Sequence, residues 1–87
     1  MKVIVNIECR LGEEAVLDHM TYMLNTLCVN TKDITYSKVY NDSYFYIIDN
    51  VNKEIYKDTI NSIIEHFNKL YAKGKIYYFY MGEYKPR

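Results

Sequence analysis

The order of apolar and polar residues predicts a strand followed by a helix in the first third of the chain. Residues 2–9 alternate, with Val3, Val5 and Ile7 on one side, which is typical of a strand that buries one face. From residue 13 to about residue 29, apolar residues recur every three or four positions, which indicates an amphipathic helix. Its apolar stripe consists of Val16, Met20, Met23, Leu24 and Leu27.

The rest of the chain predicts two strands, a second helix and a last strand. Residues 34–40 and 44–48 are rich in β-branched and aromatic residues, and the turn formers at 41–43 separate them. Residues 52–73 have helical spacing, and residues 76–81 suit a strand. The stripe of this second helix consists of Tyr56, Ile60, Ile63, Ile64, Phe67, Leu70 and Tyr71.

Two strand-helix-strand units in tandem predict an α+β fold of the ferredoxin-like type, with the order βαββαβ. Right-handed crossovers give a four-stranded antiparallel sheet in the order 4-1-3-2, with both helices on one face. The 87 residues are enough for one domain and not for two. We assign residues 1–82 to this domain and residues 83–87 to a C-terminal tail.

The face of the sheet without helices is expected to be rich in tyrosine. The charge of Lys38 requires its side chain to point to solvent, and alternation places the tyrosines on either side of it on the same face. The third strand is compatible with either orientation, and with Phe45 and Ile47 inward its tyrosines point outward. In the last strand, Phe79 and Met81 suit the core. The expected contact residues are Tyr36, Lys38, Tyr40, Tyr44, Tyr46, Tyr78 and Tyr80.

Six half-exposed tyrosine rings would present roughly 500 Å², at the upper end of the largest apolar patch on a typical monomer. Our main interpretation is contact with a protein partner or with a second copy of the chain, as in a homodimer. A solvated face that simply tolerates tyrosine is the alternative. If the face is a contact surface, Tyr46→Lys is expected to abolish partner binding and to leave the fold intact.

Charge and hydropathy argue against several classes of protein. Eleven Lys and Arg residues balance eleven Asp and Glu residues, and this neutrality argues against a binder of duplex nucleic acid. No apolar run approaches the roughly 20 residues that span a bilayer, and residues 1–6 do not resemble a signal peptide. We therefore expect a cytoplasmic protein that does not enter a membrane, in which Cys9 and Cys28 are reduced packing thiols.

Residues that could support catalysis or metal binding are sparse. His19 and His66 fall on different helices without a ligand set at metal spacing, and they flank the apolar stripes. Cys28 has no base within one helical turn that could activate it. The sequence therefore predicts a non-enzymatic binding protein with no catalytic residues, no metal site and no cofactor.

The loop before the first helix resembles two families that bind small ligands. Arg10 and Gly12, followed by an apolar helix, resemble the amino-acid-sensing ACT domain, although that pattern has Asp and Pro where Cys9 and Leu11 stand. Acylphosphatases hold phosphate with an arginine in a similar place, inside a glycine-rich cradle that this chain lacks. These resemblances imply a small-ligand site at Arg10 and Gly12, as an alternative to a plain tight turn.

A third resemblance concerns RNA. Tyr44 and Tyr46 are similar to the third-strand aromatic residues on which RNA-recognition domains stack bases, which implies single-stranded RNA as an alternative partner. The first strand has Asn6 and Glu8 where that family has an aromatic residue. The glycine-rich signature of the family is also absent.

In size, in its bias to Tyr, Asn, Ile and Lys, and in its lack of catalytic residues, the chain resembles small phage and archaeal-virus accessory proteins. Anti-CRISPR and other anti-defence inhibitors are the characterised members of that group. The resemblance covers the whole chain and rests on no motif. It implies stoichiometric inhibition in the host cytoplasm, in which the domain covers a functional surface of a host defence complex.

Overall fold

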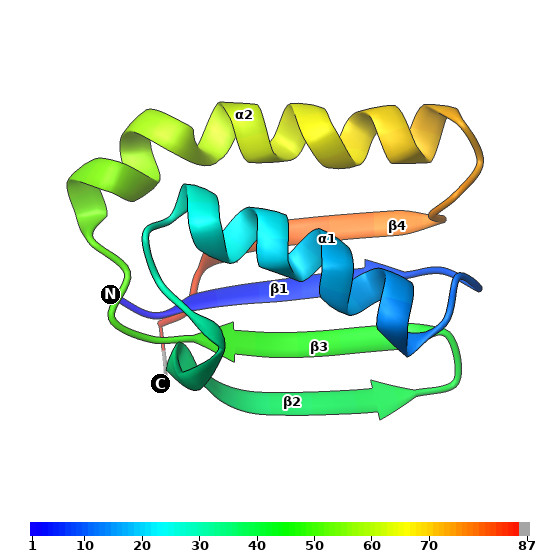
Figure 1. Cartoon of the computed structure of the whole chain (residues 1–87), viewed down its shortest axis with the longest axis horizontal. Helices are drawn as coiled ribbons and strands as arrows, with labels where there is room; N and C mark the ends of the chain where they lie inside the picture. The colour runs from blue at the N-terminus through cyan, green and yellow to red at the C-terminus, as the bar shows by residue number, and fades with distance from the viewer. Residues whose placement is uncertain (86–87) are drawn as a thin grey trace.

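The computed structural model describes residues 1–85, which form an α+β fold with two α-helices and four strands (Figure 1). A short 3₁₀ turn, η1 (Thr31–Asp33), precedes the second strand. The main elements in chain order are β1 (Val3–Glu8), α1 (Glu13–Thr26), β2 (Ile34–Tyr40), β3 (Ser43–Ile48), α2 (Lys53–Ala72) and β4 (Tyr78–Glu83).

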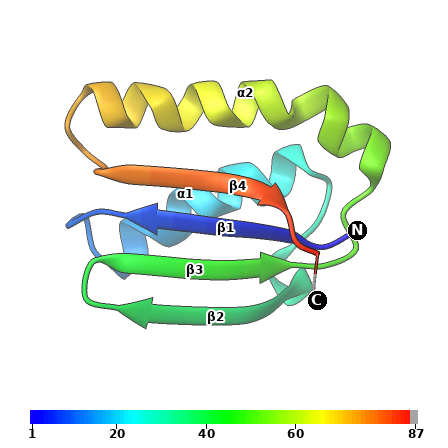
Figure 2. The same cartoon turned by 180° about the vertical axis from the view of Figure 1, so that it is seen from behind.

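The four strands form one antiparallel sheet in the order β2-β3-β1-β4, which agrees with the predicted order. The central strands are therefore β1 and β3. Helix α1 lies in front of β1 and β3 in Figure 1 and behind them in Figure 2, and α2 runs beside β4 in both views. The helices thus leave one face of the sheet uncovered.

The core lies between the two helices and the other face of the sheet. Val3, Val5 and Ile7 are buried, as are all five residues of the predicted α1 stripe. From α2, Phe67 is fully buried and stacks on Phe79 of β4, with ring centroids 4.2 Å apart and planes 3° from parallel. Removing such side chains from water contributes about 1.5–3 kcal/mol each, so this layer supplies most of the driving force for folding.

Individual residues explain where the helices start and stop. Asn52 caps the start of α2, and its side chain accepts hydrogen bonds from the backbone N–H groups of Glu54 and Ile55 at 2.9 and 3.1 Å. Helix α2 ends before Gly74, which has a left-handed φ of 71°. After α1, Cys28 takes the left-handed position that glycine usually fills, with φ 59°. The helix therefore ends at Thr26, earlier than predicted.

This helix end changes the position of one cysteine. Cys28 is exposed, so its prediction as a packing thiol is wrong, whereas Cys9 is buried. The left-handed turn at Cys28 carries its side chain away from the stripe that Leu27 continues. Both cysteines are free thiols.

The last strand is displaced by two residues from its predicted range. Strand β4 pairs with β1 along the whole length of β1, from Tyr78 opposite Glu8 to Glu83 opposite Val3. Glu83, which we assigned to the tail, is therefore the last residue of the sheet. The end of that predicted tail, residues 86–87, lies outside the described residues.

Candidate functional site

Strand β3 faces the opposite way from the sequence prediction. Tyr44 and Tyr46 are only 6% and 3% exposed, and their rings point to the helices. In the pairing of β1 with β3, Tyr44 lies opposite Ile7 and Tyr46 opposite Val5, and directly opposed residues share a face. The predicted placement of Tyr44 and Tyr46 on the uncovered face is therefore wrong.

The hairpin between β2 and β3 explains the error. Between residues 44 and 48, both alternating sets are aromatic or aliphatic, so the hydrophobic pattern alone does not orient the strand. The connection is a two-residue turn in which Asn41 has a φ of 54°, so Ser43 pairs with Tyr40 and Phe45 with Lys38. A two-residue turn at Asn41, instead of the three-residue connection we assumed, would have predicted the correct face.

The uncovered side of the sheet, which we call the open face, carries five aromatic rings that are each at least 37% exposed. It is the side turned to the viewer in Figure 2. The rings belong to Tyr36, Tyr40, Phe45, Tyr78 and Tyr80. The strand pairings place seven further residues on the same side, namely Ile4, Asn6, Glu8, Lys38, Ser43, Ile47 and Gly82.

Five of the seven predicted contact residues lie on this face. Tyr36, Lys38 and Tyr40 alternate along β2, and Tyr78 and Tyr80 alternate along β4. The sequence assigned these five residues correctly because a charged or a core-forming neighbour fixed the alternation in each strand.

Asn6 lies at the centre of the open face and ties β1 to β3. Its side-chain nitrogen donates one hydrogen bond to the hydroxyl of Ser43 at 3.0 Å and one to the backbone carbonyl of Tyr44 at 3.2 Å. The side chain is only 7% exposed. Asn6 therefore has a structural part in the sheet, and both of its amide hydrogens are engaged within the protein.

Gly82 makes room for one of the aromatic rings. A Cβ built at Gly82 would lie 2.5 Å from the hydroxyl oxygen of Tyr80, two residues earlier on the same strand. The ring of Tyr80 therefore lies along β4 over the glycine, an arrangement known to stabilise glycines in sheets. A partner would meet this ring already positioned against the sheet.

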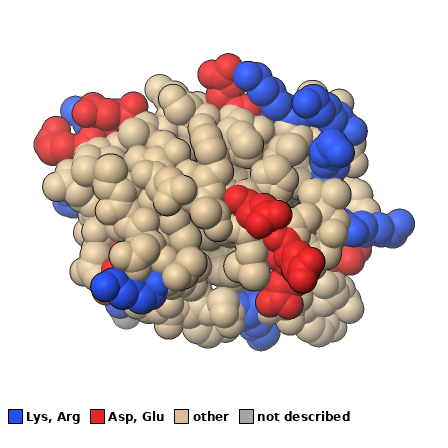
Figure 3. Space-filling model, viewed as in Figure 1, with Lys and Arg blue, Asp and Glu red and all other residues tan. Residues whose placement is uncertain are grey.

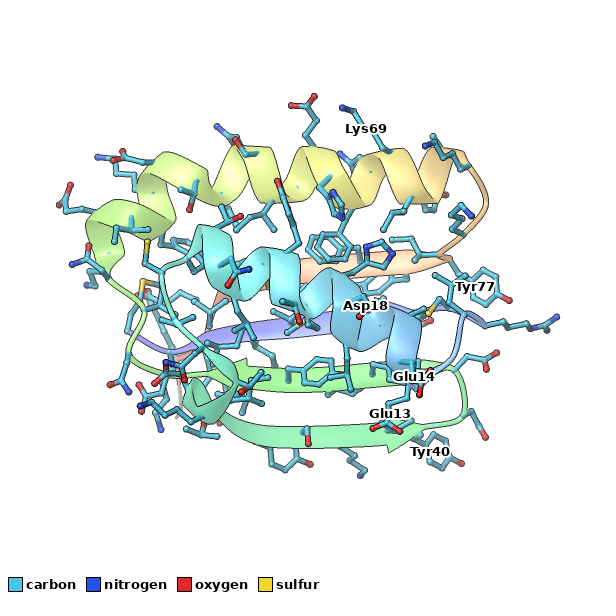
Figure 4. The ribbon with its side chains drawn as sticks, viewed as in Figure 1. Glu13, Glu14, Asp18, Tyr40, Lys69 and Tyr77 are labelled. Atoms are coloured by element: carbon cyan, nitrogen blue, oxygen red, sulfur yellow. The ribbon has the colours of Figure 1, made fainter. Side chains whose placement is uncertain are left out.

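Charge is distributed differently on the two sides of the molecule. Among the described strand residues, the open face has one acidic and one basic residue, Glu8 and Lys38. On the helix side, acidic residues gather over the start of α1 and basic residues near the end of α2 (Figure 3). Figure 4 identifies Glu13, Glu14 and Asp18 in the first group and Lys69 in the second. The open face is therefore electrically balanced and mainly aromatic.

The loop with Arg10 and Gly12 lies at the end of the sheet next to the β2–β3 turn. Arg10 is exposed, its Nε lies 3.5 Å from Oδ2 of Asp42, and its guanidinium carbon lies 5.8 Å from the ring centroid of Tyr77. Gly12 has a φ of 93° before the first turn of α1. A depression of about 300 Å³ at this end is lined by Glu8, Tyr40, Asn41, Asp42, Ser43 and Tyr77. Its two carboxylates would oppose a bound anion.

The two histidines are in contact, which their positions in the sequence did not predict. Nδ1 of His19 on α1 lies 3.2 Å from Nε2 of His66 on α2, close enough for one ring to donate a hydrogen bond to the other. Tyr22 stacks on His66 with centroids 4.2 Å apart, and Phe67 presents an edge to both histidines. The only signal in the sequence is that both histidines flank the apolar stripes of helices that pack together.

This histidine pair makes stability depend on pH. Burial, and then the charge of His19 and that of Lys69, lower the pKa of His66 below its ordinary value of 6.5. The unfolded chain therefore binds a proton at a higher pH than the folded chain does, so stability is complete above pH 6.5 and decreases as the pH falls below it. Urea denaturation between pH 7.5 and pH 5 is expected to show this decrease.

His66→Gln should make the free energy of unfolding less dependent on pH over the same range. Asp33 does not interfere with the measurement. Hydrogen bonds from the Asn50 side chain and the Asn30 backbone lower the pKa of Asp33 below 3.8, so its contribution is lost only at more acidic pH. An equally steep dependence in the variant would show that other groups control it.

Among residues 1–85, no three His, Cys, Asp or Glu side chains are grouped so that they could hold a metal ion. No helix in this part of the chain is both long and apolar enough to cross a bilayer. Comparison of the chain with protein-family models, curated proteins and solved structures gives no match.

Proposed function

We propose that the chain is a ferredoxin-like, non-enzymatic binding domain that docks on a protein partner through the open face. The observation that carries this proposal is the set of five aromatic rings on the side of the sheet that no helix covers. Together these half-exposed rings present about 400 Å², which is a large apolar patch for a monomer. Tyrosine provides much contact area at low entropic cost, and its hydroxyl stays hydrated when the face is free.

The balance of charge on the open face favours a protein over RNA. A groove that follows single-stranded RNA needs an excess of basic residues, and here Lys38 is offset by Glu8. The resemblance to RNA-recognition domains rested on Tyr44 and Tyr46, whose rings are buried. Asn6, at the position of the first-strand aromatic residue, is engaged with β3. A flat partner surface with apolar side chains and hydrogen-bond acceptors at its rim fits this face better.

The proposed mode of action is occlusion. The size and composition that resemble small viral anti-defence proteins support a host defence complex as the partner, which the domain would cover without chemistry. A neutral surface does not imitate nucleic acid, so the domain would act by blocking a protein surface.

Phe45→Lys tests the open face directly. The substitution places a charge at the centre of the aromatic patch, next to Lys38 on the neighbouring strand, and is expected to weaken partner binding at least about tenfold. The measurement is co-purification of a partner protein from host lysate in stoichiometric amount, identified by mass spectrometry and quantified by titration. Circular dichroism melting would verify that the variant is folded.

Leu17→Lys is the matched control. Leu17 lies on α1, on the opposite side of the sheet from the open face, and is 41% exposed, so this variant removes an exposed apolar side chain and adds the same charge elsewhere. It should bind the partner like the original protein. If Phe45→Lys also binds normally, or if nuclease treatment releases the captured material, the proposal of a protein-binding open face is wrong.

A further inference from the structure

The two edges of the sheet differ in how they are covered. Helix α2 runs beside β4 in both Figure 1 and Figure 2, whereas neither of the two helices in residues 1–85 runs beside β2. Every residue from 35 to 40 is exposed, and Ile34 is the only member of the strand that packs partly against the core. Strand β2 therefore presents an uncovered row of backbone N–H and C=O groups along its outer edge.

Edge strands in natural proteins usually carry features that prevent pairing with another strand, such as several charges, a proline or a bulge. Strand β2 has a single charged residue, Lys38, and no proline. Its one irregularity lies at its start, between Ile34 and Tyr36, and leaves residues 36–40 in regular pairing with β3. This edge is thus open to a further strand.

We propose that a second copy of the chain occupies this edge, with the two β2 strands antiparallel around a twofold axis at Ser37. The two registers that use most of the strand place either Ser37 or Lys38 on the axis. An axis at Lys38 would set the two lysines directly opposite each other, which is destabilising. An axis at Ser37 sets each Lys38 opposite Tyr36 of the second copy, where the ammonium group can lie against the phenol ring.

The exposure of Val39, on the helix side of β2, supports the same register. Val39 is 48% exposed although it points to the side on which the helices lie, because α1 does not reach as far as β2. With the axis at Ser37, Val39 lies beside the start of β2 of the second copy, and the pairing covers its side chain. The zero net charge of the chain provides no long-range repulsion between copies.

The resulting assembly is a continuous sheet of eight strands. Because the axis is perpendicular to the sheet, both pairs of helices lie on one side and both open faces lie on the other. Tyr36 and Tyr40 of the two copies then lie near the centre of one aromatic surface. The edge pairing does not depend on the proposed function, since it uses the backbone of β2 and leaves the open face free.

Charge substitutions at Ser37 test the pairing. Ser37→Lys and Ser37→Glu each place like charges opposite each other across the axis, and each is expected to raise the dissociation constant of the dimer at least about tenfold. An equimolar mixture of the two variants places opposite charges there and should restore the dimer. Analytical ultracentrifugation over a series of concentrations measures all three samples against the original protein.

Asn61→Lys serves as the control, because it adds the same charge at an exposed position of α2 and should leave the dimer unchanged. The proposal is overturned if the original protein stays monomeric at every concentration. It is also overturned if Ser37→Lys remains dimeric or if the mixture stays monomeric. Ser37 points away from the open face, so these variants should still bind the partner, and the two proposals can fail separately.

Discussion

Replacement of Tyr46 by lysine is expected to unfold the domain. The ring of Tyr46 is 3% exposed among the inward side chains of β1, and burial raises the pKa of its hydroxyl to about 12. A lysine at this position would lose the packing of the ring and would place an ammonium group in the core. Such a change should remove more than about 3 kcal/mol of stability, a large part of the 5–15 kcal/mol typical of a whole domain.

The measurement is urea denaturation followed by circular dichroism, with Phe45→Lys as the comparison. The two positions are adjacent in sequence and point to opposite faces, so Phe45→Lys should cost clearly less stability than Tyr46→Lys. Equal stability of the two variants would contradict the orientation of β3. Unfolding of the Tyr46→Lys variant would also contradict our expectation from the sequence that this substitution abolishes binding and leaves the fold intact.

Phe67→Ala is expected to have the second largest effect. Phe67 is fully buried, stacks on Phe79 and touches both histidines of the pair between α1 and α2. Truncation of a buried phenylalanine usually costs about 3–5 kcal/mol, because a cavity remains where neighbours cannot relax. In a domain of 87 residues this loss should leave much of the protein unfolded at room temperature.

Tyr71→Ala provides the reference for this second experiment. Tyr71 lies on the same helix four residues later and is 60% exposed, so its truncation should change stability by about 0.5 kcal/mol or less. Denaturant midpoints of the two variants, compared with the original protein, give the difference. A small effect of Phe67→Ala would mean that α2 packs against the sheet through other residues.

The element order and the sheet order could be predicted because periodicity and charge agreed in most of the chain. In β1 only one of the two alternating sets carries polar residues, Asn6 and Glu8, so its inward face is unambiguous. In α2 the predicted stripe is correct at Ile63, Phe67 and Leu70. It fails at Tyr71, because adjacent helix positions point about 100° apart and Leu70 already takes the inward direction.

The orientation of β3 could not be predicted from its own residues. Tyrosine is compatible with either face of a sheet, since its ring suits the core and its hydroxyl suits water. The direction was set by the two-residue turn and by pairing with β1, which are contacts between strands distant in sequence. The end of α1 was misjudged for a related reason, because Cys28 adopts a left-handed conformation that its residue type does not suggest.

The residues of the open face were predicted best in strands where one or two residues determined which side chains point inward and which point outward. Lys38 oriented β2, and the pair Phe79 and Met81 oriented β4, so four tyrosines of the open face were assigned correctly. The contact between His19 and His66 depends on how the two helices are placed relative to each other. Single-sequence periodicity describes each helix separately and does not contain that information.

The internal hydrogen bonds of Asn6 affect the thermodynamics of complex formation. A polar side chain at the middle of an interface usually loses water when a partner arrives, and this loss weakens binding unless a new bond replaces it. Both amide hydrogens of Asn6 already have acceptors in β3, and the side chain has little contact with solvent. A partner can therefore cover the middle of the sheet with little dehydration penalty from the amide nitrogen of Asn6, and it needs no complementary acceptor there.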